Sequence, residues 1–167
     1  TTRQQRPKEE DGVSYFFISV EKFKDKIENK EFLEYAEVFG NFYGTSKDWT
    51  LTVLSKDQNV LHELDIQGAL QVKEAFPQSQ TIFIIPPSYE DLSERLEMRA
   101  QDSTEVINKR LKEAKKEVNT GKNFDQLIVN DDFDEALNDL KTFIFSEAQL
   151  SQKRINIIRN SLDLLLD

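Results

Sequence analysis

The chain has 167 residues, a length that suffices for one domain. Of these residues, 38% are hydrophobic, which is enough for a core, and 32% are charged. Its net charge of −9 argues against general binding to nucleic acids or anionic membranes, because their phosphates would be repelled. The absence of cysteine excludes disulfides and thiolate metal sites, and the single histidine, His62, is better explained by packing and hydrogen bonding than by catalysis. No apolar run approaches the ~20 residues that span a bilayer, and the chain does not open on a signal-peptide pattern, so we expect a cytoplasmic protein.

The first third of the chain predicts short strands around one helix. Residues 15–20 are aromatic and β-branched, which is typical of a strand. Residues 21–30 carry Phe23 and Ile27 four apart, which indicates a short amphipathic helix. Residues 31–45 are expected to form short strands joined by a turn at Gly40 and Asn41, whereas residues 49–54 fit either a strand or a helix.

Three apolar runs that end in polar residues follow, at 60–66, 81–85 and 126–130, with helical segments between them. This alternation favours a layered α/β fold with a parallel sheet. Ligands of such sheets bind at the carboxyl ends of the strands, where Glu63, Asp65 and residues 130–132 are expected.

The remaining segments are expected to be helical. Ser88, followed by Asp91, is a helix N-cap, and Asp102 with Glu105 resembles a capping box at the start of the next helix. The apolar spacing from 132 to 166 indicates one long helix or two in tandem, packed within the domain or between the subunits of a homo-oligomer.

Residues 31–45 also carry the residue types that hold a small polar ring. A carboxylate such as Glu34 can accept two parallel N–H bonds, which guanine offers side by side on one edge and adenine does not. Tyr43 and Thr45 would add hydroxyls, and Arg3 and Arg6 would suit a phosphate. The alternatives are a surface glutamate beside core aromatics, and a solvated basic end of the chain.

Two further groups of charged residues have both functional and structural interpretations. Glu63 and Asp65 alternate with apolar residues, so on a strand they would share one face, either for base recognition or a magnesium–water shell, or simply exposed to solvent. Arg95, Arg99 and Arg110 would suit a transferring phosphoryl group, or would pair with neighbouring acids such as Asp91.

Taken together, these segments closely resemble the guanylate kinase family, in the family's order and over nearly the whole chain. The matching strings are residues 1–7 (TTRQQRP), 11–15 (DGVSY), 31–34 (EFLE), 40–45 (GNFYGT), 65–69 (DIQGA), 84–88 (IIPPS) and 128–132 (IVNDD).

The resemblance implies a P-loop nucleoside monophosphate kinase-like α/β fold that transfers the γ-phosphate of ATP to GMP with Mg²⁺. It implies a parallel core sheet (56–87 and 122–150), a small mixed-sheet GMP-binding subdomain (1–55), a helical lid (88–121) and a C-terminal helix (151–167). It assigns the GMP phosphate to Arg3, Arg6, Tyr15 and Tyr43, the guanine side to Glu34, Thr45 and Asp65, the base or a water-mediated Mg²⁺ to Glu63, the ATP phosphates to Arg95, Arg99 and Arg110, and the adenine pocket to Asn130.

The sequence departs from the family pattern in two places. The usual Gly-Arg-Gly of the lid is Met98-Arg99-Ala100, which would stiffen the lid or shift its hinge. No GxxxxGK[ST] loop occurs in the chain, which starts just after the segment where the family carries it. We expect the loop to lie in preceding residues; the alternative is a catalytically inactive binding module that uses the GMP pocket for a phosphorylated partner.

Overall fold

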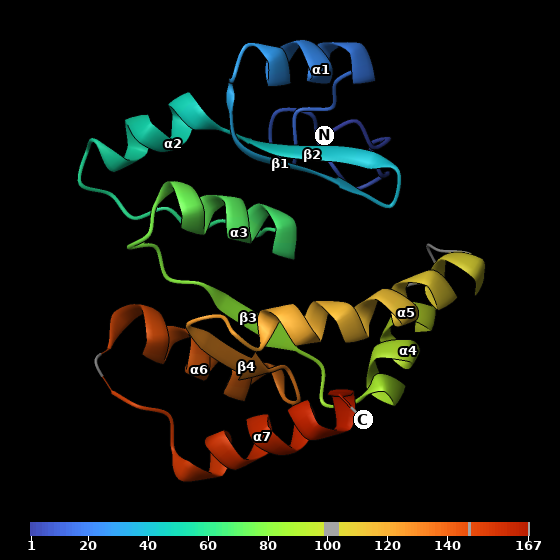
Figure 1. Ribbon diagram of the computed structural model, residues 1–167, viewed down its shortest axis with the longest axis vertical. Helices are drawn as coiled ribbons and strands as arrows, with labels where there is room; N and C mark the ends of the chain where they lie inside the picture. The colour runs from blue at the N-terminus through green and yellow to red at the C-terminus, as the bar shows by residue number, and fades with distance from the viewer. Residues whose placement is uncertain (99–103, 147, 167) are drawn as a thin grey trace. The chain divides into compact units, whose positions relative to one another are not determined.

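The computed structural model describes residues 1–98, 104–146 and 148–166, and the chain divides into two compact units, Thr1–Ser79 and Gln80–Asp167. The elements of the first unit are α1 (Val20–Glu28), β1 (Phe32–Val38), β2 (Asn41–Ser46), α2 (Lys47–Leu54) and α3 (Ile66–Ala75), as Figure 1 shows. Those of the second are β3 (Ile82–Ile85), α4 (Tyr89–Met98), α5 (Thr104–Gly121), β4 (Gln126–Val129), α6 (Phe133–Phe145) and α7 (Gln152–Leu166). The subdomain boundaries expected from the sequence stay a prediction; the division into units groups residues 56–79 with the N-terminal part.

A turn at Phe39 and Gly40, one residue earlier than the expected Gly40 and Asn41, joins β1 and β2 into an antiparallel hairpin. Phe39 and Gly40 both have positive φ, 50° and 80°, as in the two-residue turns whose twist matches that of the flanking strands. Glycine adopts this conformation without strain, which explains why the chain reverses here. The prediction of two short strands joined by a turn in residues 31–45 is therefore confirmed, but Asn41 belongs to β2 and not to the turn.

Aromatic packing holds the predicted helix α1 on the hairpin. Phe23 is fully buried, and its ring stacks on those of Phe32 and Phe42, with centroids 4.4 Å and 5.5 Å away. Ser19 caps the helix by accepting a hydrogen bond from the Lys22 N–H. Residues 49–54, for which the sequence allowed a strand or a helix, belong to helix α2. Ser46 caps this helix by accepting a hydrogen bond from the Trp49 N–H.

Two predicted strands are wrong. Residues 60–65 are irregular and are followed by α3, because Asp65 caps that helix through the Gly68 N–H, 3.0 Å away. Residues 16–19 are also outside any ladder; instead, Thr1 bonds the chain at both ends of this stretch, through Phe16 O and Ile18 N. β-branched and aromatic residues favour extended backbone, but a strand also needs a partner to pair with.

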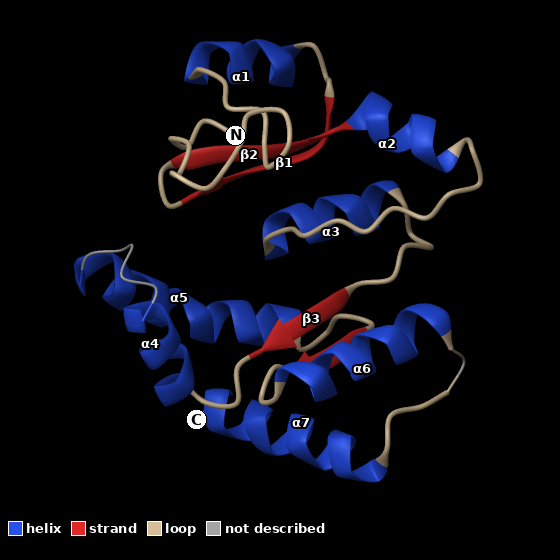
Figure 2. Ribbon diagram, turned by 180° about the vertical axis from the view of Figure 1, so that it is seen from behind, coloured by secondary structure: helices blue, strands red, loops and turns tan. Residues whose placement is uncertain are grey.

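The two remaining apolar runs form the expected parallel pair, with β3 and β4 in register from Ile82 and Gln126 to Ile85 and Val129. Ile85 and Val129 join Val118 of α5 and Leu165 of α7 in one buried cluster, so both helices cover this pair of strands. The segment after residue 132 is two tandem helices, α6 and α7, as one of the two alternatives proposed (Figure 2).

The predicted cap at Ser88 is confirmed, because its Oγ accepts from the Asp91 N–H at 3.1 Å and donates to Asp91 Oδ2 at 2.7 Å. Asp102, the predicted start of the next helix, lies outside the described residues, and α5 is described from Thr104. Among the described residues, no helix combines the length and apolarity required to cross a membrane.

Candidate functional site

A buried carboxylate forms the centre of the candidate site in the first unit. Glu34 of β1 is only 4% exposed and lies opposite Thr45 of β2, whose hydroxyl donates to Glu34 Oε1 at 2.6 Å. Burial raises the pKa of Glu34, and the negative charge of Asp65 raises it further, against the lowering effect of the Thr45 hydrogen bonds. The hairpin register thus brings together two residues that the sequence analysis assigned to one ligand.

The first turn of α3 adds Asp65 and a close approach of backbone to this carboxylate. A Cβ atom on Gly68 would lie 2.6 Å from Glu34 Oε2 and 3.2 Å from Asp65 Oδ1, so any larger residue would collide with Glu34. The two carboxylates therefore approach the same point above the start of α3. Asp65 also serves as the N-cap of the helix, which fixes its orientation.

Gln71 is a contributor that the sequence analysis missed. Its side-chain amide makes two hydrogen bonds to the main chain of Tyr35, the residue after Glu34. Oε1 accepts from the Tyr35 N–H at 3.2 Å, and Nε2 donates to the Tyr35 carbonyl at 2.8 Å. The Gln71 amide thus pairs with β1 as the backbone of a neighbouring strand would, and it connects α3 to β1. The available signal was helical spacing, since Gln71 lies three residues after Gly68 and on the same face of α3.

A second cluster gathers Arg3 with aromatic rings. The Arg3 guanidinium lies 5.5 Å from the ring centre of Tyr15, and Tyr15 contacts the Tyr43 ring edge-on at 6.1 Å. Arg3 also donates to both carboxylate oxygens of Glu9, at 2.7 Å and 3.0 Å. The hydrogen bond to Glu9 and a further one to Tyr43 raise the pKa of Arg3, although burial works in the other direction. Three of the four predicted phosphate contacts are thus neighbours.

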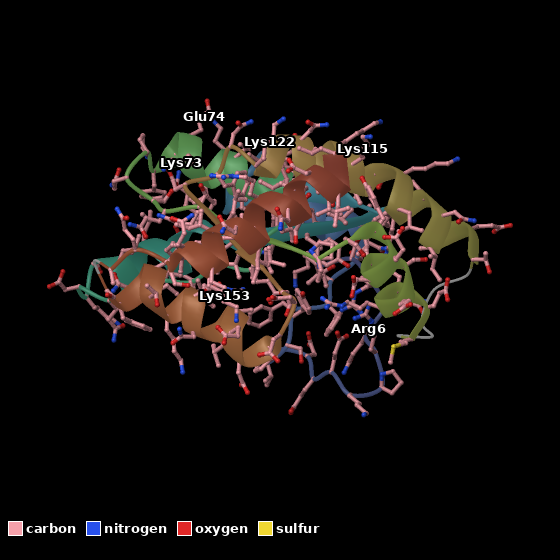
Figure 3. The ribbon with its side chains drawn as sticks, turned by 90° about the horizontal axis from the view of Figure 1, so that it is seen from below. Arg6, Lys73, Glu74, Lys115, Lys122 and Lys153 are labelled. Atoms are coloured by element: carbon pink, nitrogen blue, oxygen red, sulfur yellow. The ribbon has the colours of Figure 1, made fainter. Side chains whose placement is uncertain are left out.

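Arg6 and Glu63, the other residues of this unit predicted to bind a ligand, are exposed, whereas His62 is partly buried. Arg6 lies on the N-terminal segment, labelled in Figure 3, and its backbone N–H donates to Glu9 Oε2 at 2.8 Å. Glu63 lies on the irregular segment before α3, so the expectation that it shares a strand face with Asp65 is wrong. His62 is partly buried as expected, which lowers its pKa, but its Nε2 has no hydrogen-bond partner among the residues described, so the expected hydrogen bond is not found at that atom.

In the second unit, the predicted arginines lie on neighbouring helices. Arg95 is in the last turn of α4 and Arg110 is on α5, two helices that pack against each other, and both side chains are partly buried. Arg99 lies outside the described residues. Asn130 directly follows β4, and its N–H donates to the Ile85 carbonyl at 2.9 Å, which continues the parallel pairing by one residue. Asn130 is therefore at the carboxyl end of the strands, as predicted.

Comparison with known proteins identifies the family. The model of the family described as guanylate kinase matches residues 1–147. The chain belongs to the guanylate kinase family. It is 53% identical to the guanylate kinase of Hahella chejuensis over 147 residues, which are 88% of this chain and 71% of that protein. It is 48% identical to the guanylate kinase of Vibrio parahaemolyticus over 166 residues, 99% of this chain and 80% of that one.

Solved structures give the same answer for the fold. The guanylate kinase from Anaplasma phagocytophilum superposes with a TM-score of 0.75 at 33% identity, covering 92% of this chain and 74% of that one. The resemblance inferred from seven short strings is therefore confirmed, and with it the P-loop kinase-like α/β fold. The family match ends at residue 147, before α7 begins at Gln152.

Proposed function

We propose that the two clusters of the first unit bind the two ends of GMP, as the acceptor site of a guanylate kinase that transfers the γ-phosphate of ATP and releases ADP and GDP. The observation that carries this proposal is the buried carboxylate of Glu34, with Thr45 on one oxygen and the glycine of α3 beside the other. A carboxylate has about four lone-pair positions, so Glu34 can accept the ring N–H and the amine of guanine while it keeps its bond to Thr45. Asp65 would strengthen recognition of the same edge.

The cluster of Arg3, Tyr15 and Tyr43 would hold the phosphate of GMP. Of the five N–H donors of the planar guanidinium, two bond Glu9, one bonds the Gln4 carbonyl and one bonds Tyr43, so the phosphate would take the remaining donor and would replace Tyr43 or Gln4 at another. Glu9 would keep the arginine fork in place before the substrate arrives. Arg6, exposed on the same segment, would add a second positive charge.

The second unit would bind ATP. Arg95, Arg99 and Arg110 would stabilise the negative charge that spreads over the phosphoryl oxygens during transfer. Asn130, at the carboxyl end of β4, would lie at the adenine. These roles are what family membership implies for the matching positions, and positive charge on α4 and α5 is the chemistry that phosphoryl transfer requires.

Mg²⁺ bound with ATP would neutralise charge on the phosphates. In the parts of the chain that the structure describes, no three acids or histidines form a cluster that could hold the ion. Mg²⁺ commonly keeps several waters and binds through substrate phosphates, with few protein ligands. Asp65 has the chemistry for a metal-bound water, because among the described residues its oxygens accept from Gly68 N and Gln67 Nε2 and retain further lone pairs. Glu63 would reach the ion only through water.

A coupled assay on the full-length protein tests the reaction directly. ADP should form from ATP and Mg²⁺ only when GMP is present, and removal of Mg²⁺ with a chelator should abolish it. AMP and CMP in place of GMP serve as controls for base recognition. Absence of turnover with GMP would refute the proposed reaction, and turnover would exclude the inactive binding module.

A further inference from the structure

Arg154 of α7 is a buried cation with an unusually complete set of partners. It is 5% exposed, and its guanidinium makes four hydrogen bonds to three different groups. Nε donates to Asp139 Oδ2 at 2.7 Å, one terminal nitrogen donates to both oxygens of Asp131 at 2.8 Å and 2.9 Å, and the other donates to the Val129 carbonyl at 3.0 Å. The three partners come from α6, from the loop after β4 and from β4 itself.

Two of these partners flank Asn130. Val129 precedes it and Asp131 follows it, while the N–H of Asn130 itself is bonded to the Ile85 carbonyl at 2.9 Å. One side chain of α7 thus bonds the backbone carbonyl of the residue before Asn130 and the side-chain carboxylate of the residue after it. Together with the bond from the Asn130 N–H, these contacts restrict the backbone position from which the Asn130 side chain projects.

The geometry requires arginine. The fork of a guanidinium can reach a carbonyl, a bidentate carboxylate and a second carboxylate from one plane, whereas a lysine ammonium offers three donors at one point. Burial acts to raise the pKa of Asp131, but the Asp132 N–H and Arg154 outweigh it and keep that pKa below its usual range. Asp131 therefore faces Arg154 as an anion at neutral pH, and Asp139, only 1% exposed, accepts from Arg154 Nε at 2.7 Å.

We propose that Arg154 is a positioning residue of the ATP site, which fixes the loop that presents Asn130 to the donor nucleotide. This inference depends on the proposed function, because it takes Asn130 to lie at the adenine. It assigns a role in substrate binding to α7, a helix beyond the residues that the family model matches. The competing explanation is that Arg154 only anchors α7, in which case its loss would change stability and leave substrate binding by the folded enzyme unchanged.

Steady-state kinetics of four single variants and one double variant of the full-length enzyme separate these explanations. Arg154→Lys keeps the charge and removes the fork, and Asp131→Asn loosens the loop while leaving the buried contact between Arg154 and Asp139 in place. Arg159→Lys is the matched control, because Arg159 is exposed on the same helix. Asn130→Ala is the reference for loss of the presented side chain.

We expect Arg154→Lys and Asp131→Asn to raise the KM for ATP about tenfold, since small displacements of a positioned group have effects of this order or larger. The KM for GMP should change by less than about twofold, and Arg159→Lys should behave as the parent enzyme. Adding Asn130→Ala to Asp131→Asn should raise the KM for ATP little beyond the value for Asn130→Ala alone, because both changes remove the same contact.

Three results would overturn the inference. If Asn130→Ala raises the KM for ATP but Asp131→Asn does not, Arg154 is not a positioning residue and the proposed function stands. If the KM values for ATP and GMP rise together, Arg154 supports the fold in general. If Asn130→Ala leaves the KM for ATP unchanged, the proposed role of Asn130 fails first and the inference with it. Should Arg154→Lys not fold, Asp131→Asn alone decides between these outcomes.

Discussion

Glu34 is the residue on which substrate discrimination is proposed to depend, because a buried carboxylate is expensive unless a ligand supplies donors to it. Its structural partner is the neutral hydroxyl of Thr45, and Asp65 adds negative charge nearby. A guanine edge would provide the N–H donors that such an arrangement lacks. The expected turn at Gly40 and Asn41 would not have placed Glu34 opposite Thr45, because moving a hairpin turn by one residue shifts the pairing of the strands by two; the observed turn at Phe39 and Gly40 sets this register.

Replacing Glu34 with glutamine should weaken use of GMP. The substitution is nearly isosteric but turns one acceptor into a donor, which would face the guanine N–H groups. The expected loss is roughly 2 kcal/mol, or about 30-fold in kcat/KM for GMP, with the KM for ATP little changed. Glu37→Gln is the control, as Glu37 is exposed on the same strand. Equal loss for GMP and inosine monophosphate, which lacks the amine, would argue against recognition of that amine by Glu34.

The raised pKa of Glu34 makes GMP binding sensitive to mild acid. Guanine requires the ionised carboxylate, so the KM for GMP should rise as pH falls, starting above the ordinary glutamate pKa of 4.5. In the Glu34→Gln variant, the KM for GMP should not show this rise at low pH. A KM for GMP that is flat between pH 7 and 5 would contradict the assignment.

The free energy of unfolding should also depend on the titration of Glu34, but here the protonated form is the more favourable one, whereas GMP binding needs the ionised form. A carboxylate with a raised folded-state pKa binds protons more readily in the folded than in the unfolded protein. Its contribution is therefore fully present below pH 4.5 and is lost as pH rises through the folded-state pKa. Denaturant unfolding without nucleotide, compared between the parent protein and Glu34→Gln, isolates this contribution.

At the scale of elements, α3 depends on one side-chain amide for its attachment beside the site. Removing the Gln71 amide by Gln71→Ala leaves the N–H and carbonyl of Tyr35 without these partners. We expect unfolding to become easier by about 1–2 kcal/mol and the KM for GMP to rise several-fold, because Glu34 is the next residue on β1. Glu74→Ala is the control: Glu74 is exposed on α3, and Figure 3 shows its side chain pointing away from the protein. A rise in the KM for ATP alone would contradict this assignment.

The strands show which parts of the secondary structure the sequence pattern could predict. Residues 81–85 and 126–130 were predicted as parallel strands because almost continuous apolar runs fit burial on both faces. Residues 15–20 and 60–66 are also rich in apolar residues, yet each ends in a helix cap and the first helical residue: Ser19 and Val20 for α1, Asp65 and Ile66 for α3. Composition reports a preference for extended backbone, whereas the pairing partner is set by distant parts of the chain. For the same reason, the contacts of Gln71 and Arg154 could not be predicted from the sequence, because their partners lie 36 residues and up to 25 residues away.

At the scale of the whole molecule, the proposed contacts divide between the two compact units. Those for GMP lie within Thr1–Ser79, on the N-terminal segment, the hairpin and the start of α3. Those for ATP that the structure describes lie within Gln80–Asp167, on α4, α5 and the loop after β4. The boundaries expected from the sequence placed residues 56–87, and with them Asp65, in the core and not with the GMP-binding subdomain, because the contacts that join α3 to β1 are not visible in the order of motifs.

Hydrogen exchange with one substrate at a time should therefore give two different protection patterns. A ligand that binds only the folded state at about 100 times its Kd adds about 2.7 kcal/mol, or about 100-fold slower exchange for amides that open with its site. GMP alone should protect β1, β2 and the first turn of α3, and ATP with Mg²⁺ should protect α4, α5 and residues 130–132. Glu34→Gln at the same GMP concentration should lose most of the first pattern and keep the second. Protection by GMP in the second unit without protection of the hairpin would contradict the division of the substrates between the units.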